Sequence, residues 1–406
     1  MLRTVIPALA GCLLVACGGP NEREATTGSS TNVLDADGDG FTIGQGDCDD
    51  TDADIHPDAL DVVGDDVDNN CDDVDGTDGD RDGQASVGTG GEDCDDTDVD
   101  IYLGAEEIGW DTIDQDCDGA DRYDFLELAA GEYHTCGIGS DGGIRCWGDD
   151  AHGQVSAAPT SGVWEQIDAA KNFTCAVDEA GAVACWGADA EGKTVGMTAG
   201  PPAEESYTDV ALGFQFGCAL TDDNFVRCWG NDDSQQVSLA PENTPADALA
   251  AGGEFACIIM RVTGETLCWG NDQADQVTNA PKGEDVVGDI VEYTRIGIGS
   301  SHGCAVRVDQ GLRCWGDNEY EQANAPSDQG PYSRIASFDD FTCGIISNRE
   351  LSCWGIDTFG QIDDAPDDFD VVEVEPGVSH ACVVRADNGH AECWGRDDFG
   401  QATVPW

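Results

Sequence analysis

From about residue 125 onward, apolar and polar residues alternate in short runs, without the 3.6-residue period of an amphipathic helix. Each unit opens with an apolar run such as 167–170 or 210–213 and continues through a cysteine. A polar turn follows, and the chain returns through a second cysteine into Trp-Gly. This pattern predicts short antiparallel strands and no amphipathic helix in this half of the chain.

The unit recurs seven times. The first cysteines stand at 136, 175, 218, 257, 304, 343 and 382, which gives a period of 39 to 47 residues. A period near 40 built from short alternating segments predicts the blades of a β-propeller. The seventh unit stops at Trp406 without the apolar strand that opens every other unit, whereas a surplus apolar strand precedes the first unit. We therefore expect residues 123–129 to complete the blade left open at the C-terminus, since an open edge invites mispairing.

The seven cysteine pairs are better explained as disulfides than as metal ligands or catalytic thiols. Zinc knuckles space their cysteines two to four residues apart, and a catalytic thiol does not explain seven copies. Cys136 and Cys146 are symmetric about Asp141, and opposed strand residues lie ~4.5–5.5 Å apart, within disulfide reach. Two units have one extra residue, which the turn can hold. The predicted hairpin disulfides, with bridges between blades as the alternative, are Cys136–Cys146, Cys175–Cys185, Cys218–Cys228, Cys257–Cys268, Cys304–Cys314, Cys343–Cys353 and Cys382–Cys393.

The repeated aromatic residues could form a ligand-binding ring, but packing between blades explains them more simply. One tryptophan follows the second cysteine of every unit: Trp147, Trp186, Trp229, Trp269, Trp315, Trp354 and Trp394. His134, His302 and His380 share one position of the unit with phenylalanines Phe173, Phe216, Phe255 and Phe341. Interchange with phenylalanine indicates a packed position rather than a ligand or a base. His152 and His390 stand alone in turns or loops. No nucleophile elbow, phosphate loop or His-Glu-x-x-His motif occurs, so we assign no catalytic residue.

Residues 35–121 differ in character, being dense in aspartate, poor in apolar residues and carrying one basic residue, Arg81. Low apolar content excludes a large core. The segment is a tandem repeat: Cys48 and Cys71 are 23 residues apart, and so are Cys94 and Cys117. Equal spacing predicts one disulfide in each repeat.

Aspartates at alternate positions, followed by a glycine that forces a turn, wrap a hard cation in oxygen ligands at ~2.3–2.6 Å. Four such loops occur, although the second has Asp73 where glycine is expected, and no glutamate stands at position twelve as in an EF-hand. Aspartates beside the first cysteine of each repeat could complete the sites. The candidate ligands are Asp35, Asp37, Asp39, Asp47, Asp50, Asp68, Asn70, Asp72, Asp78, Asp80, Asp82, Asp93, Asp96, Asp114, Asp116 and Asp118. The oxygen set predicts Ca²⁺; copper prefers imidazole or sulfur, and His56 is the segment's one histidine. A merely solvated acidic linker is the remaining alternative.

The N-terminus reads as a secretion signal, with basic Arg3, an apolar stretch and small residues. Leu14-Val15-Ala16-Cys17 resembles the bacterial lipobox, which predicts a signal peptide over 1–16 and lipidation of Cys17. The alternative is an ordinary signal peptide that ends nearby. Gly18 after the cysteine favours, by resemblance, the outer membrane of a Gram-negative cell. Residues 17–34 are small and polar, as in a flexible tether.

The net charge of the chain limits the classes of molecule that it can bind. The chain has 83 acidic and 17 basic residues, a net charge of −66. Nucleic acid is excluded as a partner, because phosphate binding needs lysine and arginine, and electrostatic attachment to anionic lipid is disfavoured.

Two family resemblances follow from these motifs. The run Gly-x-x-His-Thr-Cys … Cys-Trp-Gly-x-(Asp/Asn)-x-x-Gly-Gln resembles the regulator of chromosome condensation repeat over about 123–406. The resemblance implies a seven-bladed β-propeller; the eukaryotic namesake activates a nuclear GTPase, and one bacterial type inhibits β-lactamases by protein contact. The Asp-rich repeats resemble thrombospondin type 3 calcium loops and, more closely, a metal-binding repeat of bacterial surface proteins named for a methanotroph copper-binding protein.

We therefore expect an all-β chain: a signal peptide (1–16), a tether (17–34), a loop-dominated calcium-binding region (35–121) and a seven-bladed propeller (122–406). The expected function is binding rather than catalysis, by a lipid-anchored protein of the outer membrane or cell surface. A protein or glycan partner is expected on the loop face, where loops such as 188–209 and 271–296 vary between units. The alternatives are an enzyme acting on polysaccharide through an acidic propeller face and a passive component of the envelope or matrix.

Overall fold

The computed structural model describes residues 35–61, 63, 67–105, 107–110, 113–117, 123–187, 197–283, 291–326, 330–367 and 369–405. The predicted signal peptide, the lipidation site Cys17, the tether, Asp118 and parts of the two variable loops lie outside these residues. The chain divides into two compact units, Met1–Leu103 and Gly104–Trp406. Residues 104–117, which we had grouped with the Asp-rich repeats, thus fall in the second unit.

The second unit contains seven antiparallel sheets of three strands, each made of consecutive strands in the order first, second, third. The blades are β1 (Phe125–Ala130), β2 (His134–Gly139) and β3 (Ile144–Gly148); β4 (Trp164–Ala170), β5 (Phe173–Asp178) and β6 (Val183–Gly187); β7 (Tyr207–Leu212), β8 (Phe216–Thr221) and β9 (Val226–Gly230); β10 (Ala246–Gly252), β11 (Phe255–Met260) and β12 (Thr266–Gly270); β13 (Tyr293–Ile298), β14 (His302–Arg307) and β15 (Leu312–Gly316); β16 (Tyr332–Phe338), β17 (Phe341–Ile346) and β18 (Leu351–Gly355); β19 (Val371–Pro376), β20 (His380–Arg385) and β21 (Ala391–Gly395).

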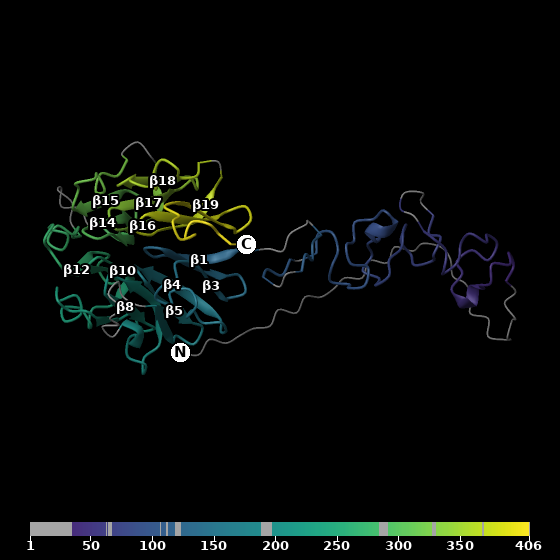
Figure 1. Cartoon of the computed structure of the whole chain (residues 1–406), viewed down its shortest axis with the longest axis horizontal. Coiled ribbons are helices and arrows are strands. Elements are labelled where there is room, and N and C mark those ends of the chain that lie inside the picture. Colours follow the sequence, from purple (N-terminus) through teal and green to yellow (C-terminus); the bar gives the residue numbers. More distant parts are fainter. Residues whose placement is uncertain are drawn as a thin grey trace, which may run out of the picture. The chain divides into compact units, whose positions relative to one another are not determined.

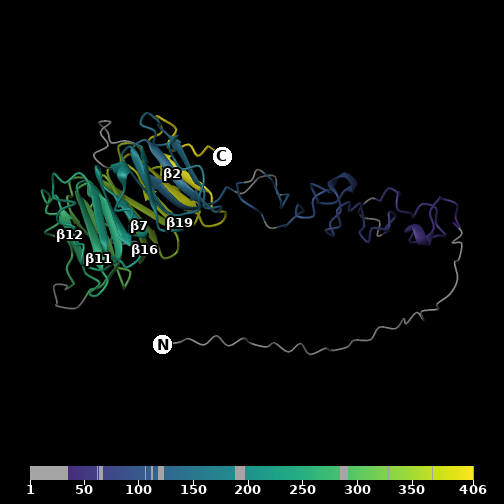
Figure 2. The same cartoon turned by 90° about the horizontal axis from the view of Figure 1, so that it is seen from below.

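The first strands of the blades form the inner ring. Each packs beside the first strand of the next blade, from β1 through β4, β7, β10, β13 and β16 to β19, and β19 packs against β1 (Figure 1, Figure 2). This arrangement confirms the predicted all-β, seven-bladed propeller. The described residues of this unit contain one short 3-10 helix, η3 (Met197–Ala199).

The ring does not close as we expected. Residues 123–129 do not complete the last blade, because β1 pairs with β2 of its own blade and β19–β20–β21 is already a full sheet. Closure comes instead from the C-terminal segment. The carbonyl oxygen of Gln401 accepts hydrogen bonds from Trp147 Nε1 at 3.0 Å and from Thr135 Oγ1 at 2.9 Å. The N-terminal blade is thus held by hydrogen bonds rather than by an exchanged strand.

The same contact joins all blades. Each repeated tryptophan donates its indole N–H to a backbone carbonyl in the loop that follows the preceding blade, at 2.8–3.0 Å. The acceptors are Gln401, Gln154, Met197, Gln236, Gln276, Gln322 and Gln361, in blade order. Buried indoles need such a partner for their one donor. The tryptophans are therefore packing residues, as predicted, and no ring of exposed ligands exists among them.

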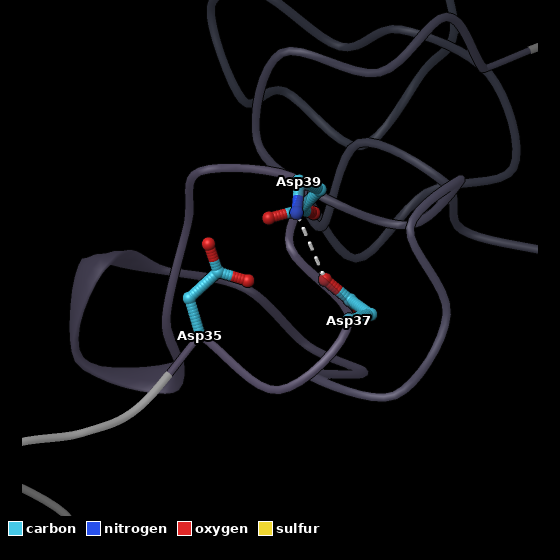
Figure 3. A group of neighbouring side chains, drawn as sticks. All are labelled: Asp35, Asp37 and Asp39. Atoms are coloured by element: carbon cyan, nitrogen blue, oxygen red, sulfur yellow. Dashed lines mark hydrogen bonds between the residues drawn. The ribbon is translucent and has the colours of Figure 1, made fainter.

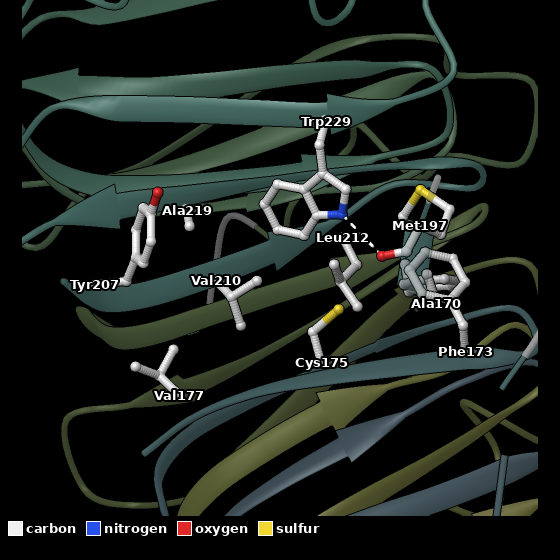
Figure 4. Packing of buried hydrophobic residues seen from close by; sticks show 11 residues of the cluster. Ala170, Phe173, Cys175, Val177, Met197, Tyr207, Val210, Leu212, Ala219 and Trp229 are labelled. Carbon is white, nitrogen blue, oxygen red and sulfur yellow. Dashed lines mark hydrogen bonds between the residues drawn. The ribbon is translucent and has the colours of Figure 1, made fainter. Parts of the chain in front are cut away.

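Hydrophobic clusters fill the space between neighbouring blades. In one of them Phe173 of blade 2 packs with Leu212 and Trp229 of blade 3, and the Trp229 indole reaches the Met197 carbonyl (Figure 4). Phe173 is fully buried. Burial of one such side chain contributes roughly 1.5–3 kcal/mol, so the repeated aromatic positions supply much of the contact between blades.

The three histidines that replace phenylalanine are likewise fully buried. Nε2 of His134 and of His302 lies 2.7 Å from a threonine hydroxyl of the next blade, and His380 Nε2 lies 2.8 Å from Thr135 Oγ1. Burial lowers the pKa of these imidazoles to about 3, 4 and 4 respectively. They are neutral packing residues with one added hydrogen bond, in agreement with the interchange with phenylalanine.

The structure pairs the propeller cysteines within each hairpin. The two cysteines face each other in every ladder, with Cα atoms 4.0–4.1 Å apart. In the two units with an extra residue the partners remain opposite, as for Cys257 and Cys268, and the turn absorbs the insertion. Bridges between blades, the alternative pairing, do not form.

The first unit is built from loops with two 3-10 helices, η1 (Ile43–Gln45) and η2 (Val87–Thr89). A disulfide joins Cys48 to Cys71. Cys94 of this unit is disulfide-bonded, and so is Cys117 of the second unit. Across the described residues, no helix combines the length and apolar character needed to cross a bilayer.

Candidate metal centres and propeller contact face

The first Asp-rich loop curls around its own carboxylates. Asp35 accepts the amide of Gly38 on Oδ1 at 2.6 Å and that of Gly40 on Oδ2 at 3.0 Å. Both glycines have positive φ, +90° and +106°, which a side chain would strain. Asp37 and Asp39 project into the same turn, and the amide of Asp39 donates to Asp37 Oδ1 at 3.2 Å (Figure 3). Oxygens of the three carboxylates lie within 4.8 Å of one another.

The second repeat reproduces this geometry. Asp78 accepts the amides of Arg81 at 2.6 Å and Gly83 at 3.0 Å, and oxygens of Asp78, Asp80 and Asp82 again lie within 4.8 Å of one another. Two loops with different neighbouring residues reach one arrangement, which indicates that the Asp-x-Asp-x-Asp-Gly spacing itself dictates it.

Each repeat leaves an equivalent set of three carboxylate oxygens buried without a hydrogen-bond donor among the described residues. They are the Oδ2 atoms of Asp37, Asp39 and Asp47 in the first repeat and of Asp80, Asp82 and Asp93 in the second. Asp47 and Asp93 are themselves almost fully buried, at 2% and 1% exposure. A buried carboxylate oxygen without a partner is costly. The repetition of this set at equivalent positions is what a bound cation would explain.

The electrostatics agree with that interpretation. Burial raises the pKa of Asp80, and the charges of Asp82, Asp78 and Asp96 raise it further. Burial likewise raises the pKa of Asp93, with added repulsion from Asp82 and Asp80. Asp93 therefore lies close to the loop carboxylates, as predicted for a residue that completes the site. A positive ion removes this repulsion.

The remaining predicted ligands are placed less uniformly. Asp50 Oδ1 accepts the amide of Ala36 at 3.3 Å, and Asp96 Oδ1 accepts that of Gly79 at 2.5 Å, so both border the loops. In the loop with Asp73 in place of glycine, Asp72 Oδ2 already accepts Asn70 Nδ2 and the amide of Asp78, each at 2.7 Å. This loop, which also contains Asp68, offers less free oxygen than the others.

Two acidic residues were missed by the sequence reasoning. Glu107 lies with Asp114 and Asp116, their oxygens within 4.8 Å of one another, and burial followed by the charges of the two aspartates raises the Glu107 pKa. Asp61 is fully buried, and neither of its oxygens has a hydrogen-bond partner in the described part of the chain. Each stands ten residues before the second cysteine of its repeat. Because they occupy the same position in the two repeats, both are candidate ligands.

The donor chemistry fits a hard cation better than copper. The clusters present carboxylate oxygen only, which suits Ca²⁺. His56 instead stacks on Phe41 with ring centroids 5.1 Å apart, and its Nδ1 accepts the amide of Asp58 at 3.3 Å. The segment's one imidazole is thus occupied by contacts outside the carboxylate clusters.

One face of the propeller carries exposed aromatic residues. It is formed by the turns between first and second strands and by the loops that begin after each third strand. Tyr320, Phe359 and Phe399 occupy one loop position in blades 5, 6 and 7 and are 44%, 43% and 50% exposed. The rings of Tyr133 and Phe399 pack in a tilted arrangement with centroids 5.1 Å apart, and the Arg396 guanidinium lies 4.9 Å from the rings of both Tyr133 and Phe359. We call Tyr133, Tyr320, Phe359, Arg396 and Phe399 the aromatic patch.

The axial cavity, with a volume of about 160 Å³, is lined by the first strands and by several acids. Glu127 accepts the amide of Ile167 at 3.1 Å, and Asp168 accepts that of Leu212 at 2.7 Å, each across to the next blade. These contacts satisfy the open edges of the first strands. Burial raises the pKa of Asp168 to about 7. Both carboxylates thus accept backbone hydrogen bonds that join neighbouring first strands.

Family models match both parts of the chain. The model described as "Regulator of chromosome condensation (RCC1) repeat" matches residues 126–154, 207–236 and 293–322. A model described as "Putative metal-binding motif", with a copper-binding protein in its name, matches residues 47–76 and 93–121. No curated protein matches the chain significantly.

Solved structures share the fold at low sequence identity. The ectodomain of the Physcomitrella patens receptor kinase CR4 matches with a TM-score of 0.57 and 20% identity over 67% of this chain and 73% of that one. The ectodomain of the Arabidopsis thaliana receptor kinase ACR4 gives 0.55 and 20% over 67% and 96%. Saccharomyces cerevisiae Prp20p gives 0.53 and 16% over 62% and 80%. With seven blades in register and three segments matched, this chain carries RCC1 repeats folded into an RCC1-like propeller, preceded by a metal-binding motif of two copies.

Proposed function

We propose that this chain is a non-catalytic envelope lipoprotein whose propeller binds a protein partner through the aromatic patch. The fold supports protein binding: yeast RCC1 (Prp20) has been solved bound to Kap60, and Prp20p is described with binding to Gsp1p and histones. Those partners belong to those proteins; what transfers is the use of a propeller as a binding platform.

The observation that carries the proposal is the contrast between buried and exposed positions on this face. The loop glutamines Gln322, Gln361 and Gln401 are buried at 0–1% exposure and repeat from blade to blade. Two residues before each of them stands an exposed ring of the aromatic patch. Exposed aromatic side chains clustered with arginine are typical of the energetic centre of protein interfaces. The acidic loops around them favour a basic partner surface.

Affinity capture from envelope extracts of the source cells, with the secreted chain as bait, tests the proposal. The double variant Phe359→Ala and Phe399→Ala should lose the captured protein, whereas Val262→Ala should retain it. Val262 is 83% exposed in the β11–β12 turn at the other end of a blade, which makes it a matched control. Equal capture by both variants would refute the patch as the contact face. Capture of nothing by the wild-type chain would favour the passive envelope component, and turnover of an envelope polysaccharide by the chain would favour the enzyme.

We further propose that the Asp-rich repeats bind Ca²⁺ and stiffen the segment between the predicted anchor and the propeller. The buried oxygens without donors, repeated in both copies, support a cation, and the all-carboxylate set supports calcium over copper. A ligand that binds the folded state alone stabilises it by about 2.7 kcal/mol at one hundred times its dissociation constant.

Calorimetric titration of the chain with CaCl₂ and with CuCl₂ distinguishes the metals. Asp80→Asn with Asp93→Asn should abolish part of the calcium uptake, while Asp58→Asn, an exposed aspartate in the same segment, should leave it unchanged. Copper uptake without calcium uptake would overturn the assignment. Labelling with radioactive palmitate in the source cell, lost on Cys17→Ser, tests the anchor and hence the location at the envelope.

A further inference from the structure

A cavity of about 300 Å³ on blade 5 stands out in so acidic a chain. It lies between the segment that follows β12 and the hairpin end of the blade. Three basic residues line it: Lys282, Arg307 and Arg313. No carboxylate is found among its lining residues within the described part of the chain, although acids outnumber bases 83 to 17 overall. Its position lies outside both the aromatic patch and the Asp-rich repeats.

Blade 3 has a tyrosine and an arginine at the equivalent positions, and there a glutamate of the chain lies between them. Tyr207 opens the first strand there, and Arg227 is the second residue of the third strand. Glu205, two residues before the tyrosine, forms a bidentate ion pair with Arg227. Its Oε2 lies 2.8 Å from Nε, and its Oε1 accepts a hydrogen bond from Nη2 at 2.9 Å. The Tyr207 hydroxyl lies 3.5 Å from Glu205 Oε2. A carboxylate thus occupies the space between arginine and tyrosine.

Blade 5 has the same arginine and tyrosine but lacks the acid. Tyr293 opens β13 as Tyr207 opens β7, and Arg313 follows the first residue of β15 as Arg227 follows that of β9. At the position of Glu205 stands Val291, which is 6% exposed and carries no charge. Arg313 forms no ion pair with any residue that the structure describes. Among the described residues, therefore, none supplies Arg313 with the bidentate partner that Glu205 gives Arg227 in blade 3.

Additional donors converge on the same cavity. Tyr293, Arg307 and Arg313 all line the cavity. Burial raises the pKa of Tyr293; the charges of Arg313 and Arg307 oppose that rise, and the charge of Asp309 adds to it. Arg307 pairs through one nitrogen with Asp309 at 2.9 Å. Its Nε is buried, and nothing in the described ranges accepts a hydrogen bond from it.

We propose that this cavity binds an oxyanion, and specifically the carboxylate of a small organic acid, with Arg313 as the bidentate partner. Arginine's planar fork matches a carboxylate better than an ammonium does. Tyr293 and Arg307, which also line the cavity, supply further donors, and Lys282 supplies a third positive charge. The ligand takes the place that Glu205 holds in blade 3.

Saturation-transfer difference NMR of the full chain with succinate as the probe tests the site. Wild-type protein should saturate succinate, and Arg313→Ala should weaken binding about tenfold or more, as expected for loss of a charge-assisted bidentate contact. Val291→Glu should abolish the signal, because it rebuilds the blade 3 arrangement within the chain. Arg349→Ala, a change in the β17–β18 turn of the next blade, should leave succinate binding unchanged and is the matched control.

The remaining outcomes also decide the question. If Val291→Glu lowers the melting temperature, Lys282→Ala, at an exposed lysine, replaces it and should still weaken binding. Inorganic phosphate as competitor separates the sources: displacement of succinate at equal concentration identifies a general oxyanion site, and failure to displace identifies a carboxylate site. Unchanged succinate binding in Arg313→Ala and Lys282→Ala, or an equal loss in Arg349→Ala, overturns the proposal. None of these results depends on a protein partner or on calcium.

Discussion

The hydrogen bond from Trp147 that closes the ring and the equivalent bond from Trp394 between two other blades should contribute differently to the free energy of unfolding. Trp147 and Trp394 occupy equivalent positions and are 5% and 8% exposed. The carbonyl that accepts from Trp394, that of Gln361, has no other donor among the described residues. The carbonyl that accepts from Trp147, that of Gln401, has a second donor in Thr135. Removal of the indole N–H therefore leaves one carbonyl without a partner and the other still satisfied.

This difference sets the expected magnitudes. Trp→Phe at either site costs a similar amount of packing, which cancels in the comparison. Loss of a satisfied hydrogen bond costs about 0.5–1.5 kcal/mol, whereas a buried polar group left alone costs about 1–3 kcal/mol. We expect Trp394→Phe to destabilise the protein by about 1 kcal/mol more than Trp147→Phe does. Adding Thr135→Val to Trp147→Phe strips Gln401 of both donors, so the double variant should exceed the sum of the single variants by about 1 kcal/mol.

Urea unfolding followed by circular dichroism measures these free energies, provided that the slope against denaturant stays constant. The single variant Thr135→Val must be measured as well, because it also removes the partner of His380 Nε2. The reasoning fails if Trp147→Phe costs as much as Trp394→Phe, or if the two changes in blade 1 add within about 0.5 kcal/mol. Either result would show that the Gln401 carbonyl does not depend on these two donors.

Three further predictions concern disulfides and pH. Cys343→Ala with Cys353→Ala removes one hairpin bridge and should cost about 2–4 kcal/mol in the free energy of unfolding; a loss in the melting temperature no larger than for an exposed Ser→Ala change would contradict it. Burial raises the pKa of Asp209 to about 7 from 3.8, so its contribution to stability is fully present at low pH and is lost as pH rises toward 7. Asp209→Asn should therefore raise the melting temperature at pH 8 but not at pH 4, and equal shifts at both pH values would refute the assignment. Burial lowers the pKa of His302 from 6.5 to about 4, so the protein should lose stability as pH falls from 6.5 to 4. His302→Phe should therefore reduce the fall of the melting temperature over this pH range. A fall as large as that of the wild type would contradict the assignment.

Side-chain periodicity and spacing were enough to predict the blades. The symmetric separation of Cys136 and Cys146 implied facing positions in a hairpin, and the ladder places them opposite each other. Interchange of His134 with Phe173 implied a packed site, and both side chains are fully buried. These inferences succeeded because the geometry of neighbouring strands restricts which residue type can stand at each of these positions.

Ring closure was predicted wrongly for a physical reason. The decisive acceptor, the backbone carbonyl of Gln401, has no side-chain signature, so the sequence showed a surplus strand and not the loop that actually completes the ring. The bulge after the first residue of every first strand, as between Phe125 and Glu127, was equally invisible. Asp61 and Glu107 were overlooked because they lie outside the Asp-x-Asp pattern, although their common distance from the second cysteine could have identified them.

The absence of strand exchange has a consequence for how this propeller can change over generations. Every blade is one contiguous stretch of chain, and each meets its predecessor through a tryptophan that recognises a loop carbonyl. Duplication or loss of a stretch of gene encoding one period therefore adds or removes a whole blade without cutting any sheet, and the new neighbour presents the same carbonyl to the same indole. The exposed rings beside those carbonyls are under no such constraint. Blade number and surface character can thus diversify independently in this architecture.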